Sequence, residues 1–416
     1  METTSFRVYG YRWVVLLSFM AVVAVNQLLW ISFAPVTDEA AGYYGVSTLS
    51  IGLLSLSFLI VYIFVSLPAS WAIDTLGVRG AVGIGAVLTG IFGLARGLAG
   101  SNFTLVLLAQ IGIAIGQPFI LNAITTVAAR WFPAQERTTA AGLGSLAIYV
   151  GILIGLALTP HMTIRSGIQG MLFDYGIASI LSMLIFFAFV RERPPTPPCP
   201  PDQEARSLVL DGFKHILRQK DFLLLMAVFF IGLGAFNAVT TWIEEILRPR
   251  GFSIVQAGNA GGLMIVGGII GALVIPILSD KYQKRTPFLI LAVIGAIIGL
   301  SGITFATSYA FLLASAAILG FFLLSAGPVG FQYGAEITYP APEGASNSLL
   351  LLMGQISGIL FILLMSSFQS SENGSMTLPL VGLIALMVMA LLFTLRLKDS
   401  TTESSSPLTG FQTSTR

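Results

Sequence analysis

Twelve runs of about 20 mostly apolar residues follow one another along this chain, separated by short polar segments. A helix needs that length to cross the hydrocarbon core of a bilayer. Backbone groups in lipid must bond within their own helix or within a closed barrel, and these runs are too long and too uniformly apolar for barrel strands. The sequence therefore predicts an all-α membrane protein with twelve membrane-spanning helices, at residues 13–36, 49–71, 80–98, 103–128, 139–159, 171–190, 222–246, 254–278, 287–307, 309–335, 345–368 and 376–396.

Composition excludes several other classes of protein. Charged residues make up 10% of the chain, against about 25% in soluble domains, so the apolar surface must face lipid. The net charge of +2 gives no reason to expect a nucleic-acid partner. One cysteine and two histidines offer no metal cluster, and we see no nucleophile set or phosphate loop. We therefore expect a monomer in the lipid bilayer that binds a small molecule, with no cofactor, no metal and no enzymatic activity.

Basic residues set the expected orientation. If the N-terminus is cytoplasmic, 17 of the 21 Lys and Arg residues fall in cytoplasmic loops and tails, and 4 fall outside. Cytoplasmic loops of membrane proteins carry this excess. The sequence thus predicts that both termini are cytoplasmic, which agrees with an even number of spans. Which membrane holds the protein stays open.

A Pro-rich and then charged segment divides the chain in two. We expect an N-terminal six-helix bundle at 1–190, a cytoplasmic linker at 191–221, a C-terminal six-helix bundle at 222–398 and a disordered cytoplasmic tail at 399–416.

The two halves repeat each other. Asp74 follows the second span and Asp280 follows the eighth, 206 residues later. Glu136 follows the fourth span and Glu343 the tenth, 207 residues later. Two motifs at nearly one spacing, in equivalent loops, indicate two pseudo-symmetric bundles.

With these motifs the chain resembles the major facilitator superfamily, whose loop after the second span holds an Asp, a Gly and basic residues. The resemblance implies two bundles that rock about a central site near the bilayer midplane. An acid at a helix end can accept hydrogen bonds from basic side chains or from a helix N-terminus, which would latch the halves in one state. The alternative is simple positive-inside topology. The candidate gating residues are Asp74, Arg79, Glu136, Arg137, Asp280 and Arg285.

Polar side chains inside spans are costly and usually face the bundle interior. In this fold, spans 1, 4, 7 and 10 line the cavity. Packing against helices or lipid, and hydrogen bonding between helices, remain the alternatives for each of these residues. The candidate substrate-binding residues are Asn26, Trp30, Gln117, Asn237, Gln332 and Gln355.

Segments of the N-terminal half are similar to the feline leukaemia virus subgroup C receptor-related family: Tyr11 to Leu17, Asn26 to Ile31, Pro68 to Thr75 and Gln117 to Leu121. Members of that family are linked to choline and ethanolamine transport, and to haem export. The resemblance implies a choline site formed by a tryptophan, two glutamines and an aromatic residue. Trp30, Gln117 and Gln355 match it, whereas Asn237 replaces a tyrosine, which weakens the expected aromatic cage. Phe236 or Trp242 could compensate.

No charged side chain is placed near the centre of a span by the sequence. We therefore expect a facilitative transporter that moves a small cationic or neutral organic solute, such as a choline-like molecule, by alternating access. A proton-coupled exporter of drugs or organic anions is an alternative, with Glu244 or Asp174 as the acid. A haem exporter and a non-transporting membrane receptor are the others.

Overall fold

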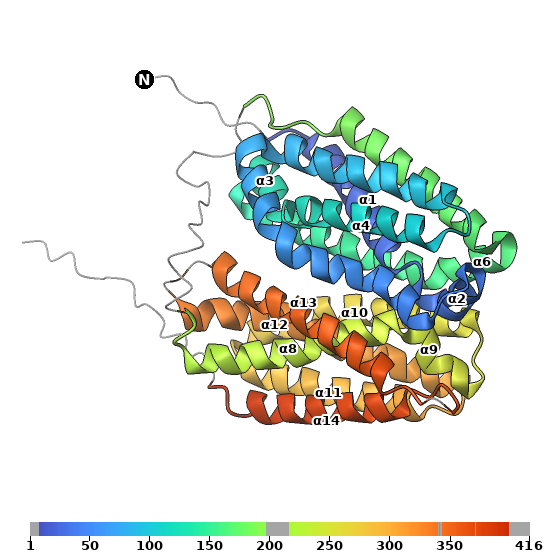
Figure 1. Ribbon diagram of the computed structural model, residues 1–416. Helices are drawn as coiled ribbons and strands as arrows, with labels where there is room; N and C mark the ends of the chain where they lie inside the picture. Colours follow the sequence, from blue (N-terminus) through green and yellow to red (C-terminus); the bar gives the residue numbers. More distant parts are fainter. Residues whose placement is uncertain (1–7, 197–215, 340, 342, 371, 399–416) are drawn as a thin grey trace, which may run out of the picture.

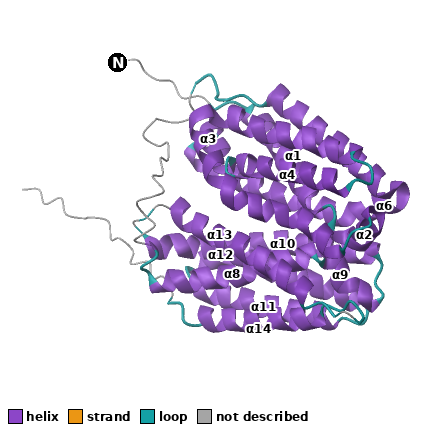
Figure 2. Ribbon diagram, viewed as in Figure 1, coloured by secondary structure: helices purple, strands orange, loops and turns teal. Residues whose placement is uncertain are grey.

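Helices account for the secondary structure throughout the described part of the chain in this computed structural model (Figures 1 and 2). The structure describes residues 8–196, 216–339, 341, 343–370 and 372–398. Most of the predicted linker and the whole predicted tail lie outside these residues. Among the described residues, ten helical segments are long and apolar enough to cross a membrane.

The first half runs from α1 to α6. Its elements are α1 (Arg12–Ile31), η1 (Ala34–Val36), α2 (Thr37–Tyr44), α3 (Thr48–Leu98), α4 (Phe103–Leu121), α5 (Ile124–Trp131), η2 (Ala134–Glu136) and α6 (Arg137–Phe189). In the first predicted span, at 13–36, the regular helix ends at residue 31, and short helices follow it.

The 51 residues of α3 form two antiparallel spans. Trp30 on α1 donates from Nε1 to the carbonyl of Ser55 near the start of α3, at 3.2 Å. The carbonyl of the neighbouring Leu29 accepts from Arg96 near the end of α3, at 3.0 Å. In a straight helix Ser55 and Arg96 would lie about 60 Å apart. The reversal occurs at Gly77, whose φ of 79° is open to glycine and strained for other residues.

The 53 residues of α6 reverse in the same way. The Thr159 and Tyr175 hydroxyls lie 2.8 Å apart, although 16 residues of straight helix would separate them by about 24 Å. Gly167, with φ of 71°, lies between them. With α3 and α6 each crossing twice, the described helices make the twelve predicted crossings.

The second half contains one crossing per long helix. Its elements are α8 (Lys220–Thr241), α9 (Ile243–Leu247), η4 (Arg248–Arg250), α10 (Ile254–Tyr282), α11 (Thr286–Phe305), α12 (Tyr309–Thr338), α13 (Glu343–Ser367) and α14 (Thr377–Thr394). The predicted span at 222–246 is too long, because the helix breaks at Trp242 and α9 follows as a separate short helix.

Helix caps repeat with the period of the sequence motifs. Ser47 caps α3 and Ser253 caps α10, each by accepting from a backbone N–H three residues on. Asn102 caps α4 and Ser308 caps α12 in the same way. Both pairs are 206 residues apart. The pseudo-symmetry therefore extends to the hydrogen bonds that begin equivalent helices.

Figure 1 shows the two halves side by side. The end of the molecule where α1 begins and α14 ends is called the termini end below, and the opposite end, which carries α2 and α9, is called the far end. The halves converge at the far end. There, α6 of the first half packs on α10 of the second, and α2 lies against α9.

Candidate substrate site

Four of the predicted site residues lie at similar depth. Counted along their helices at 1.5 Å per residue, Gln355, Gln117, Asn237 and Trp30 are about 18–27 Å from the termini end. They come from α13, α4, α8 and α1, so both halves contribute. Gln355 and Gln117 lie about halfway along their helical segments, whereas Asn237 and Trp30 lie within about 6 Å of the ends of α8 and α1 that face the far end.

Trp30 is buried, and its indole bridges α1 and α3 through the bond to Ser55. Asn26, one helical turn earlier, is fully buried and donates to the hydroxyl of Thr89 at 3.1 Å. Its carbonyl oxygen accepts from Gln27 at 3.3 Å. The hydrogen bonds described for Asn26 thus lie inside the first half.

A chain of contacts links Trp30 to the second half. One turn beyond Ser55 on α3, Leu59 lies against Gly358 of α13, where an added Cβ would be 2.9 Å from its Cδ1. The same Cβ would be 2.7 Å from the amide nitrogen of Asn237. That nitrogen donates to the carbonyl of Gly354 at 3.2 Å. First-half α3 therefore reaches the residues that position Asn237.

Gln355 follows Gly354 on α13 and is half-buried. Its carbonyl oxygen is buried, and no hydrogen-bond donor is described for it. Such an acceptor costs free energy unless a polar group meets it. Gln117 is also buried, on α4, but no described bond joins it to the other three residues. Trp30 and Asn237 are thus linked through Leu59 and Gly358. Gln355 is the chain neighbour of the carbonyl that Asn237 bonds, and no described bond joins Gln355 or Gln117 to the other candidates.

Gln332 is placed elsewhere. It is exposed on α12 near the termini end and donates to the Glu336 carboxylate at 3.0 Å. Trp242 is also not a wall of this site: it is fully buried and donates to the carbonyl of Ile362 at 3.1 Å. Its ring contacts Gly52 of the first half, where an added Cβ would be 2.5 Å away. Trp242 therefore fills the contact between the halves.

Arg96 is one of the four basic residues that the sequence places outside. In the structure it is instead 1% exposed inside the first half. It donates to the carbonyls of Leu29 and the Gln110 side chain, and it lies over the Phe33 ring at 5.4 Å. An arginine inside an otherwise apolar run is the signal that could have identified this buried cation.

The candidate gating residues of the second half form one cluster. Arg285, at the start of α11, pairs with Asp280 of α10 and, at 3.0 Å, with Glu336 of α12. Partial burial opposes its charge, but the two carboxylates together raise the pKa of Arg285. The cluster ties three helices of one half together.

In the first half the equivalent cluster is built around Glu192, a residue that the sequence did not single out. Its carboxylate accepts from the backbone N–H groups of Val78 and Arg79, at 3.0 and 2.7 Å, and pairs with Arg130. Asp74, the predicted acid, is exposed.

The remaining gating candidates also bond within the first half. Glu136 pairs with Arg12 at 3.0 Å, and Arg137 donates to the carbonyl of Phe132 at 3.3 Å. The contacts described for the gating candidates thus join residues of the same half, and whether they latch the halves in another state stays a prediction.

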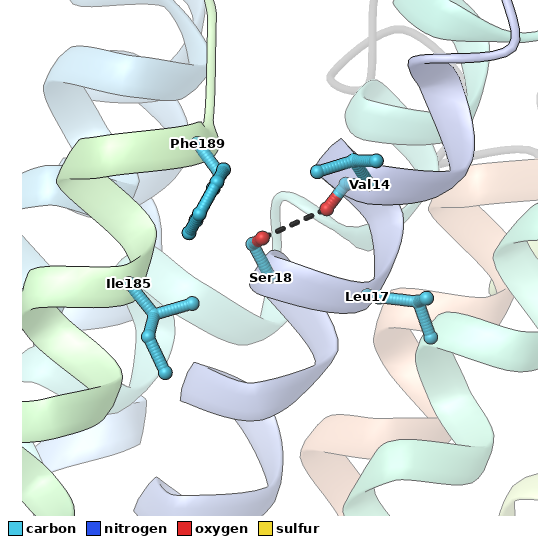
Figure 3. Close-up of a pocket in the computed structure, with 5 residues that line it drawn as sticks. All are labelled: Val14, Leu17, Ser18, Ile185 and Phe189. Carbon is cyan, nitrogen blue, oxygen red and sulfur yellow. Dashed lines mark hydrogen bonds between the residues drawn. The ribbon is translucent and has the colours of Figure 1, made fainter.

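Figure 3 shows a shallow pocket between α1 and α6 near the termini end, of about 290 Å³. Its polar hydroxyl, on Ser18, already donates to the carbonyl of Val14 at 2.8 Å. The rest of the lining is formed by exposed Val14, Leu17, Ile185 and Phe189. This surface suits an acyl chain of the bilayer and contains none of the predicted site residues.

Comparison with known proteins shows which family this chain belongs to. A profile described as Major Facilitator Superfamily matches residues 15–362. Solute carrier family 49 member A3 of Xenopus tropicalis is 33% identical, over 87% of this chain and 79% of its own length. Choline/ethanolamine transporter FLVCR1 of Felis catus is 30% identical, over 85% of this chain and 67% of its own length.

Solved structures show the same fold. The crystal structure of a bacterial homolog to human lysosomal transporter, Spinster, in an inward-facing and unoccupied conformation, matches with a TM-score of 0.70 and 18% identity. The match covers 94% of this chain and 96% of that one. A D-xylose-proton symporter matches with a TM-score of 0.71 and 16% identity, over 95% and 99% of the chains.

Proposed function

Because this chain belongs to the Major Facilitator Superfamily, and within it to the feline leukaemia virus subgroup C receptor-related family, we propose that it carries a choline-like solute by facilitated alternating access. The protein is an integral, multi-pass membrane transporter and not an enzyme. The predicted family and fold are confirmed.

One observation carries the choice of substrate class. Trp30, Asn237 and Gln355 are uncharged. Trp30 and Asn237 are linked through Leu59 and Gly358 across the halves, and Gln355 follows Gly354, whose carbonyl accepts from Asn237. An aromatic face attracts a quaternary ammonium, which contributes about 1–2 kcal/mol when water is excluded. Amide oxygens can accept from the hydroxyl of an amino alcohol. Such a site favours a cationic or neutral solute over an anion, which would find no positive partner among these three side chains.

The end at which the halves meet supports alternating access. The halves meet at the far end through α2, α9, α6 and α10, while the termini-end clusters described above bond within one half. We propose that the termini end is cytoplasmic, as the excess of basic residues there predicts. The structure would then correspond to a state closed to the outside, and rocking of the halves about the candidate site would open the far end.

Uptake by purified protein in liposomes tests the proposal. Labelled choline and ethanolamine should enter protein-containing liposomes, and Trp30→Ala and Gln355→Ala should reduce the rate at least tenfold. Gln169→Ala, at an exposed position of α6, is the matched control and should retain the rate. Normal uptake by both site variants at equal protein content would overturn this site assignment.

Energy coupling needs a separate measurement. A facilitative carrier equilibrates choline without concentrating it, whatever pH gradient is imposed across the liposome membrane. Accumulation above the external concentration that depends on the pH gradient would favour the proton-coupled alternative instead.

A further inference from the structure

Two adjacent carboxylates are buried at the far end, outside the candidate site. Glu244 and Glu245 of α9 are 1% and 0% exposed. Glu245 bonds within its own half: Arg248 donates to one of its oxygens at 3.1 Å and Gln369 to the other at 2.9 Å. Burial of two neighbouring acids is costly unless partners or a proton neutralise them.

Glu244 bonds instead to the other half. Its Oε2 accepts from the backbone N–H of Asp38 in α2, at 3.0 Å. Its Oε1 lies 3.3 Å from Nε of Arg248, and Nη1 of Arg248 lies 3.3 Å from the Asp38 carboxylate. Glu244 and Arg248 together therefore tie α9 and η4 of the second half to α2 of the first.

Opening of the far end must break these bonds, since α2 and α9 belong to different halves. We propose that α2 and α9 form the gate that closes the far end, and that this gate opens when the Glu244 carboxyl loses its proton. This gate rests on the alternating access proposed above, and the Glu244 carboxyl is the group that controls one of its two conformations.

The charges around Glu244 explain the expected sign. Glu245 on α9 and Glu39 on α2 repel its negative form, whereas Arg248 of η4 attracts it. Arg250, the other cation of η4, donates to the backbone carbonyls of Ile246 and Thr304. Burial and then Glu245 are the largest causes that raise the pKa of Glu244 to about 8.

Water would reach Glu244 once the gate opens, and its pKa would fall toward the ordinary value of 4.5. The closed form therefore binds the proton more tightly, so acid favours closure and base favours opening. Between pH 6 and pH 9, this linkage raises the ratio of open to closed molecules by up to about a hundredfold.

Spin-label distances across the far end test the gate without any substrate. The chain has one cysteine, so Cys199→Ser provides a cysteine-free background. Ser101→Cys and Thr307→Cys then place labels at exposed far-end positions of the first and second halves. In lipid nanodiscs, a longer-distance population should grow as the pH rises from 6 to 9.

Variants identify the responsible group. Glu244→Gln mimics the protonated acid and should keep the short distance at every pH. Asp38→Asn removes a carboxylate that pairs with Arg248 but keeps the backbone N–H, so it should favour the open form while the pH dependence persists. Glu372→Gln changes an exposed far-end acid and should behave as the unmodified protein.

Two results would overturn the proposal: distances in the unmodified protein that do not change with pH, or an unchanged pH dependence in Glu244→Gln. Neither depends on choline transport, because the measurement contains no solute. If choline is not transported but the distances still change with pH, the choline proposal is wrong and the gate proposal stands.

Discussion

Gly258 offers a direct way to force the halves apart at the far end. It lies on α10, and an added Cβ would be 2.5 Å from the backbone carbonyl oxygen of Leu156 and 2.7 Å from Cγ of Pro160. Both residues belong to α6 of the other half. Real Cβ atoms essentially never approach within 3.0 Å of such a neighbour, so the substitution Gly258→Ala must move the two helices at least 0.5 Å apart.

The size of the effect follows from where the clash occurs. Overpacking of a tight contact costs about 1–3 kcal/mol. Only the conformation in which α6 touches α10 bears that cost, because the contact is between the halves. The ratio of far-end-open to far-end-closed molecules should therefore rise about 5- to 150-fold in Gly258→Ala.

The labels at Ser101→Cys and Thr307→Cys report this shift, with the long-distance population as the measured quantity. Gly262→Ala is the matched control on the same face of α10, since its Cβ would meet the Cβ of Ala157 at 3.3 Å, which a small adjustment relieves. Indistinguishable distance distributions in the two variants would refute the idea that α6 and α10 separate when the far end opens.

Three other predictions concern the termini end and the solute. Arg285→Ala leaves two carboxylates without their shared cation and should reduce the unfolding free energy by about 1–2 kcal/mol. The melting temperature in detergent should fall accordingly, and Arg285→Lys should partly restore it. Glu192→Ala removes an ion pair and two bonds to backbone N–H groups and should lower the unfolding free energy by about 1 kcal/mol in the same assay. Equal melting temperatures of Glu192→Ala and Glu372→Ala would contradict this. Asn237→Tyr adds an aromatic face at the site and should tighten choline binding about 5- to 30-fold in a competition assay, and unchanged binding would remove this position from the site.

The sequence predicted most of the fold because lipid imposes it. Every long apolar run had to become a helix, and the spacing of Asp74 and Asp280 revealed the repeat that the helix caps share. The breaks were less predictable. Trp242 lies at the break between α8 and α9, where its indole bonds to a carbonyl of α13 and its ring packs against α3.

The candidate site was predicted only in part. Side-chain polarity inside a span identifies groups that need partners, but it does not say which partners they find. Asn26 and Gln355 carry the same amide group. The Asn26 amide donates to Thr89 inside one half, whereas the Gln355 amide has a buried oxygen with no described donor.

The residues that join the two halves were decided by tertiary structure alone. The repeat places Asp38 and Glu244, which are 206 residues apart, at equivalent positions of the two halves, but the order of residues does not show that the two bond to each other. Apolar length and the positions of basic residues determine where each helix crosses and predict which side its ends face. The packing of one bundle on the other determines which charges lose water and pair, because that depends on distances in space.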